Sequence, residues 1–119
     1  MGVLEIIAVV ALAVLAVGAV ALISCLTVKH LRESRIKKNN TKIVTKMNTV
    51  IGALKKEATK VSFNELEELE KMEKESPYVV AEYDPDTDKV VKVERAKDAD
   101  KQIQSRLENS ETGVIEVYE

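Results

Sequence analysis

An unbroken run of 23 residues without a formal charge, Ile6 to Val28, is the feature that most constrains this 119-residue chain. As an α-helix a run of this length extends about 35 Å, which exceeds the hydrocarbon thickness of a bilayer, about 30 Å. A domain built from the remaining residues is too small to bury so uniformly apolar a helix. The run therefore predicts a single transmembrane helix, and residues 1–28 are assigned to a membrane anchor.

Basic residues follow this run directly, and no Lys or Arg precedes it. Because basic flanks stay on the cytoplasmic side, the sequence predicts an N-terminus outside and a cytoplasmic C-terminal head. Near an anionic leaflet each basic side chain adds about 1 kcal/mol of attraction. The residues expected to contact membrane lipids are Lys29, Arg32, Arg35, Lys37 and Lys38, with the single histidine, His30, at the level of the headgroups.

Residues 22–25, Leu-Ile-Ser-Cys, offer an alternative, because they have the form of a bacterial lipobox. In that interpretation Cys25 is lipidated and the head works outside the cell. A signal peptide, however, starts with positive charges and has an apolar stretch of about 7 to 15 residues. This chain has Glu5 there and a longer apolar run, so the anchor is favoured over the exported lipoprotein.

The charges divide the rest of the chain into a basic neck and an acidic head. Residues 29–60 carry ten basic and two acidic side chains, whereas residues 61–119 carry eight basic and seventeen acidic ones. The neck, residues 29–61, is predicted to be helical because its apolar residues recur at helical spacing. This spacing fits a helix packed on its own domain or a short coiled coil. The apolar positions are Val44, Met47, Ile51, Leu54, Ala58 and Val61.

The head, residues 62–119, is predicted to begin with an acidic helix over residues 62–76. Ser62 and Glu65 have the spacing of a capping box at its start, and the Ser76-Pro77 pair ends it. One face of this helix is apolar and is expected either to cover the head's own sheet or to bind a partner. The residues of that face are Phe63, Leu66, Leu69 and Met72.

The last 42 residues are predicted to form a β-β-α-β module, which makes the fold class α+β. The expected elements are strands 78–83 and 89–94, a helix over 98–110 capped by Asp98, and a strand over 114–118. The expected sheet order is second, first, third, with the third strand antiparallel to the first.

The linker between the first two of these strands, DPDTD, alternates Asp84, Asp86 and Asp88 like the start of a calcium loop. A calcium loop of this type needs glycine at its sixth position and an acid at its twelfth. Those positions hold Lys89 and Arg95, so a hairpin turn is predicted instead, with no metal site.

No residue pattern points to catalysis or to a cofactor. The lone cysteine excludes an internal disulfide, and an aromatic content of 3% without Trp disfavours nucleic-acid binding. A small sheet needs cover, which suggests a protein partner or a homo-oligomer. The sequence therefore predicts a non-catalytic, single-pass adaptor or accessory subunit that holds a protein partner at the cytoplasmic membrane face. A further alternative is a small membrane protein that modulates a larger complex through its span.

Overall fold

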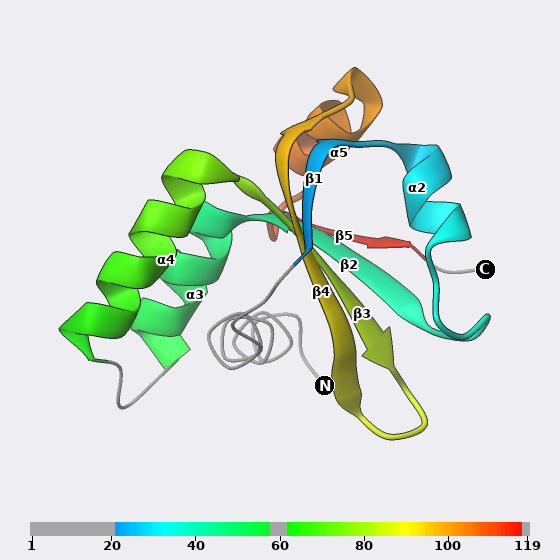
Figure 1. Cartoon of the computed structure of the whole chain (residues 1–119), viewed down its shortest axis with the longest axis horizontal. Helices are drawn as coiled ribbons and strands as arrows, with labels where there is room; N and C mark the ends of the chain where they lie inside the picture. Colours follow the sequence, from blue (N-terminus) through cyan, green and yellow to red (C-terminus); the bar gives the residue numbers. More distant parts are fainter. Residues whose placement is uncertain (1–20, 58–61, 118–119) are drawn as a thin grey trace.

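The computed structural model describes residues 21–57 and 62–117, and over this part of the chain the fold is α+β. Four helices pack against a mixed five-stranded sheet (Figure 1). In chain order the elements are β1 (Ala21–Leu26), α2 (Val28–Glu33), β2 (Thr41–Lys46), α3 (Met47–Glu57), α4 (Phe63–Glu75), β3 (Tyr78–Asp84), β4 (Lys89–Ala99), α5 (Lys101–Asn109) and β5 (Val114–Val117).

The strand order is β1-β4-β3-β2-β5, so the first and last strands are the two edges. Strand β1 pairs with β4 in parallel, and the other three pairings are antiparallel. Because side chains alternate along each strand, the sheet has two faces, and both are covered. Helices α3 and α4 lie side by side over one face, whereas α2 and α5 lie on the other side of the sheet (Figure 1).

Each face has its own apolar core. On the α3/α4 side Val79 and Ala81 of β3 are fully buried against these helices. On the α2/α5 side Val80, which lies between them in sequence, is 1% exposed and packs with Leu31 of α2 and Ile103 of α5. The alternation along β3 therefore supplies both cores from consecutive residues.

Strand β2 corrects both the predicted neck and the predicted sheet. The helix expected throughout residues 29–61 is interrupted by Thr41–Lys46, which lies between β3 and β5. Strand β5 consequently pairs with β2 and runs parallel to β3, whereas the sequence predicted an antiparallel neighbour. The physical reason is composition: four of the six residues in TKIVTK are β-branched, which favours extended backbone.

In the neck, the apolar residues at helical spacing form a helix only from Met47 onward. Met47, Ile51 and Leu54 are buried in the core of the α3/α4 side, within their own domain. Val44, the first position of the predicted seam, lies in β2 and faces the opposite core. The last two positions, residues 58 and 61, lie outside the described residues.

Strand β1 and helix α2 occupy the C-terminal end of the predicted transmembrane helix. Ala21–Leu26 is extended and pairs with the second half of β4, and Val28 begins α2. Residues 6–20 of the predicted helix lie outside the described residues. Within residues 21–57 and 62–117, no helix combines the length and the apolar character that crossing a bilayer requires.

Strand β4 is longer than predicted, and α5 starts later. The strand continues to Ala99 because β1 supplies a second partner for its last residues, from Glu94 to Ala99. The helix cap is therefore Asp100, whose side chain accepts a hydrogen bond from the backbone N–H of Ile103, and not Asp98.

The DPDTD segment forms the predicted hairpin turn between β3 and β4. Asp84 accepts a hydrogen bond from the backbone N–H of Asp86, and Asp88 has a φ of 57°, the left-handed conformation expected at this position. The Tyr83 hydroxyl donates a hydrogen bond to the Asp88 carboxylate. In the described part of the chain, no group of three or more His, Cys, Asp or Glu side chains is arranged to hold a metal ion.

Two glycines should respond in opposite directions to alanine. Gly113→Ala should lower the free energy of unfolding by about 1 to 2 kcal/mol, because a left-handed residue with a Cβ costs about that much. The φ of Gly113 is 75°, and its added Cβ would lie 3.1 Å from Thr49 Oγ1. Gly52→Ala, with open space around the methyl group in α3, should instead raise the free energy by about 0.5 to 1 kcal/mol. Denaturant unfolding of both variants measures the difference, and equal shifts would contradict the conformation at Gly113.

Candidate functional site

Three charged side chains are buried together on the α2/α5 side of the sheet. Lys42 of β2 is 1% exposed, Glu82 of β3 is 0% exposed, and Glu94 of β4 is 4% exposed. The Lys42 Nζ atom lies 3.4 Å from Glu82 Oε1 and 3.5 Å from Glu94 Oε1. One ammonium group thus bridges two carboxylates from neighbouring strands, and the Nζ atom of the partly exposed Lys92, 3.8 Å from Glu94 Oε1, adds a second positive charge that offsets part of the cost of burying them.

The second oxygens of both carboxylates hold α2 and the loop that follows it, residues 34–40. Glu94 Oε2 lies 3.0 Å from His30 Nε2, and this histidine belongs to α2. Glu82 Oε2 accepts hydrogen bonds from the backbone N–H of Ile36 at 2.8 Å and from Asn40 Nδ2 at 2.6 Å. The buried charges therefore fix the position of α2 and its loop over the sheet, and His30 takes part in this network.

These contacts lower the pKa of Glu82. Burial alone raises the pKa of this carboxyl group, but the hydrogen bonds from Asn40 and Ile36 and the charge of Lys42 outweigh burial. The carboxylate form of Glu82 is consequently favoured in the folded protein.

A second ion pair ties the same loop to the end of β3. Lys37 Nζ lies 3.0 Å from Asp84 Oδ2. The hydrogen bond between them raises the pKa of Lys37 and lowers that of Asp84. Because the Lys37 side chain is 55% exposed, water screens this ion pair. We expect the pair to fix the position of the loop and to add little to the free energy of unfolding.

Sequence reasoning missed the buried network, although one signal for it exists. In each of the three strands a charged residue lies two positions from a buried apolar residue on the same face, and Lys42 lies directly opposite Glu82 in the ladder. Opposite charges at such cross-strand positions stabilise a sheet. The signal becomes readable only once residues 41–46 are recognised as a strand and its register is known.

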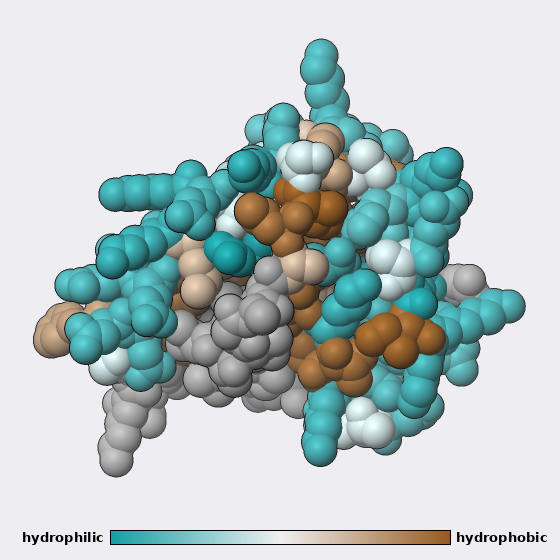
Figure 2. All heavy atoms as spheres, in the orientation of Figure 1, coloured by the Kyte–Doolittle hydropathy of each residue, from teal (hydrophilic) through white to brown (hydrophobic). Residues whose placement is uncertain are grey.

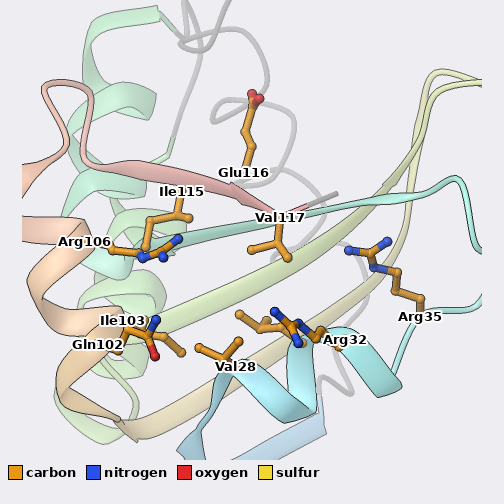
Figure 3. A pocket seen from close by; sticks show the side chains of 10 residues that line it. Val28, Arg32, Arg35, Gln102, Ile103, Arg106, Ile115, Glu116 and Val117 are labelled. Atoms are coloured by element: carbon orange, nitrogen blue, oxygen red, sulfur yellow. The ribbon is translucent and has the colours of Figure 1, made fainter. Parts of the chain in front are cut away.

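Next to this network a pocket of about 530 Å³ opens between α2, α5 and β5 (Figure 3). The lining is about half apolar, and aliphatic side chains from all three elements form that part. These are Val28, Leu31, Ile103, Ile115 and Val117. A pocket of this size suits a small ligand or part of a larger one.

Three arginines line the same pocket, each from a different segment. Arg32 belongs to α2, Arg35 to the loop after it and Arg106 to α5 (Figure 3). Among the described residues no carboxylate lies within 4.0 Å of any of these guanidinium groups. The side chain of Glu116 points away from the other labelled side chains (Figure 3), so the pocket presents positive charge beside apolar surface.

The remaining predicted membrane-contact residues lie close by. Lys29 is exposed on α2, and Lys37 and Lys38 are exposed on the loop. With Arg32 and Arg35 they form what we call the basic surface, the exposed side of α2 and residues 34–40. Cys25, the alternative lipidation site, is exposed in β1.

The apolar face of α4 lies on the opposite side of the sheet. Leu69 is fully buried in the core of that side, and Leu66 and Met72 pack against this core. Phe63, by contrast, is 85% exposed, because it occupies the first turn of the helix. Three of the four residues therefore cover their own domain, and only Phe63 projects into solvent.

The two charged sites differ in what they can do. The three charged side chains at the centre of the Lys42 network are buried and bonded to one another, to α2 and to the loop, so the network acts on the position of α2 and the loop. The arginine-lined pocket is open and carries positive charges without carboxylate partners in the described part of the chain, so it is the candidate binding site. No family model, curated protein or solved structure matches the chain.

Proposed function

We propose that this protein is a non-catalytic, single-pass membrane adaptor whose folded domain lies at the cytoplasmic membrane face and holds a protein partner there. The observation that carries this proposal is the separation of charge between the two sides of the sheet. Residues 28–40 carry five basic and one acidic residue, a net charge of +4. On the opposite side α4 carries six glutamates and two lysines, a net charge of −4.

This polarity suits a domain held between an anionic membrane and a second protein. The basic surface faces the lipid, where each side chain adds about 1 kcal/mol of attraction. Helix α4 then points away from the membrane, with its glutamates and the exposed Phe63 available to a partner with a basic surface. Hydrophilic side chains cover the α4 side of the molecule, whereas hydrophobic ones gather over β1 (Figure 2).

Strand β1 sets the length of the proposed anchor. Residues 21–26 cannot be helical in the bilayer and paired with β4 at the same time. The residues before β1 that carry no formal charge, residues 6–20, would extend about 22 Å as a helix, which crosses most of a hydrocarbon thickness of about 30 Å. We therefore place the anchor before β1, with Leu22, 48% exposed, at the inner interface.

Labelling of Cys25 tests this arrangement, because the chain has no other cysteine. In inside-out membrane vesicles that contain the full-length chain, a membrane-impermeant maleimide should label Cys25, and in right-side-out vesicles it should not. Protection on both sides would mean that the bilayer covers Cys25 and that β1 does not form in the membrane. Labelling from the outside alone, or a lipid on Cys25 found by mass spectrometry, would refute the cytoplasmic location.

A photo-crosslinking residue tests the partner. Placed at position 63, it should give one discrete adduct in intact cells, because Phe63 is the exposed apolar residue of α4. Placed at Lys101, an exposed position of α5 on the membrane-facing side, it should give none of the same mass. The same adduct from both positions, or none from position 63, would contradict the assignment of α4 to a partner.

A further inference from the structure

The arginine-lined pocket differs from the rest of the basic surface because it combines positive charge with a concave apolar lining. Lys29 and Lys38 are exposed and do not line the pocket. Arg32, Arg35 and Arg106 instead surround a cavity of about 530 Å³. A cavity with this lining fits a ligand that carries an anionic group next to an apolar part.

The arginines determine the chemistry of the anionic group. Guanidinium groups bind phosphate through paired N–H donors in a fixed plane, and these charge-assisted hydrogen bonds are about twice as strong as neutral ones. Arg35 donates from Nη1 to the carbonyl oxygen of Lys38, and its buried Nε has no hydrogen-bond partner among the described residues. The three guanidinium groups come from three segments and lie apart from one another (Figure 3), so a phosphate in the pocket can be bound by the nearest of them.

We propose that this pocket binds the headgroup phosphate of an anionic phospholipid, with the glycerol and the first acyl carbons against the apolar lining. The inference rests on the proposed location at the membrane and adds a specific ligand to it. Val28 lines the pocket and follows β1 after a single intervening residue, Thr27. The pocket therefore begins next to the end of the strand that we place at the membrane interface. The exposed apolar side chains of β1 place this strand along the interface, which brings α2 to the level of the phosphates.

An acidic protein segment is a poorer occupant. Such a segment would bring several carboxylates, whereas the pocket has three cations at its rim and five aliphatic residues inside. A phospholipid matches both parts of the lining with one molecule.

Two double variants separate this site from general attraction to anions. The first, Arg32→Gln with Arg106→Gln, removes two charges from the pocket. The second, Lys29→Gln with Lys101→Gln, removes two charges from the same helices, α2 and α5, but from exposed positions that do not line the pocket. Both variants change the net charge equally, so only the location differs.

The test uses the full-length chain in an uncharged detergent, titrated with short-chain phosphatidic acid, phosphatidylcholine of the same chain length, or inorganic phosphate. Phosphatidic acid should bind saturably and raise the melting temperature, as a ligand of the folded state does. The pocket variant should bind it at least about tenfold more weakly, the loss expected for charge-assisted hydrogen bonds. The control variant should bind it within about twofold of the unmodified protein.

The other outcomes would overturn the proposal. Equal weakening in both variants would show unspecific attraction, and inorganic phosphate binding as tightly as phosphatidic acid would show a site for free anions. Binding of phosphatidylcholine, whose phosphate is balanced by a quaternary ammonium group, at the same strength would refute the preference for an anionic headgroup. If Cys25 labelling confirms the cytoplasmic location but phosphatidic acid does not bind, only the assignment of the pocket is refuted. If phosphatidic acid binds but Cys25 labelling places the domain outside, only the proposed function is refuted.

Discussion

Replacing Lys42 with methionine should lower the free energy of unfolding by about 3 to 5 kcal/mol at pH 7, the cost of leaving buried charges without their partner. Methionine keeps most of the aliphatic volume of the lysine, so the loss reports charge and not a cavity. Glu82 and Glu94, both nearly inaccessible, would remain without the ammonium group that lies within 3.5 Å of each. Denaturant unfolding of the full-length chain in neutral detergent measures this loss.

The pH dependence of the same variant identifies the mechanism. In the unmodified protein the pKa of Glu82 is lowered from 4.5, so its contribution is present above that value and is lost as pH falls through the folded pKa. Without Lys42, one of the groups that lower this pKa is lost, so the pKa of Glu82 should be higher in the variant than in the unmodified protein. As pH falls, the carboxylate of the variant is protonated first, which should reduce the difference in stability between variant and unmodified protein.

Lys46→Met is the matched control, because Lys46 lies four residues further along β2, on the same side of the sheet, and is partly exposed. Its loss should stay within about 0.5 kcal/mol and should not change between pH 5 and 7. An equal loss in both variants would mean that the strand tolerates methionine poorly, and it would refute the charge network as the cause.

Leu69→Ala should lower the free energy of unfolding by about 2 to 5 kcal/mol, the range for a buried leucine that leaves a cavity. Leu69 is fully buried between α4 and the core that contains Leu54 of α3 and Val79 of β3. Urea unfolding of the full-length chain gives the loss directly.

Phe63→Ala is the control on the same helix. Phe63 is 85% exposed, so its truncation should change stability by less than about 0.5 kcal/mol but should weaken binding of the partner proposed for α4. If Leu69→Ala left stability unchanged and Phe63→Ala reduced it, the packing of α4 described above would be wrong.

Local signals in the sequence were sufficient for several elements. Ser62 accepts a hydrogen bond from the backbone N–H of Glu65, as the capping pattern predicts, and the following helix ends at Glu75. Asp88 adopts the left-handed conformation that the DPDTD turn requires. Each of these features depends on residues within about one turn of one another, so the sequence alone contains the information.

The strand pairings depend on distant residues and were not predictable in the same way. The apolar spacing that begins at Val44 fits a helix, and nothing local shows that residues 41–46 form the strand that separates β3 from β5. The candidate binding site was not predictable for the same reason, because its residues are distant in the sequence. Arg32 and Arg35 were assigned to the membrane surface, but Arg106 could join them only after β5 and α5 had been located in space.

The parallel pairing of β1 with β4 also has a consequence for biosynthesis. Ala21 lies opposite Glu94, so the strand must wait for a partner made 73 residues later. At about 5 to 20 residues per second, translation takes roughly 4 to 15 s to cover that distance. Throughout this interval β1 has no sheet to join. The order of synthesis therefore leaves this edge of the sheet open until the second half of β4 has been made.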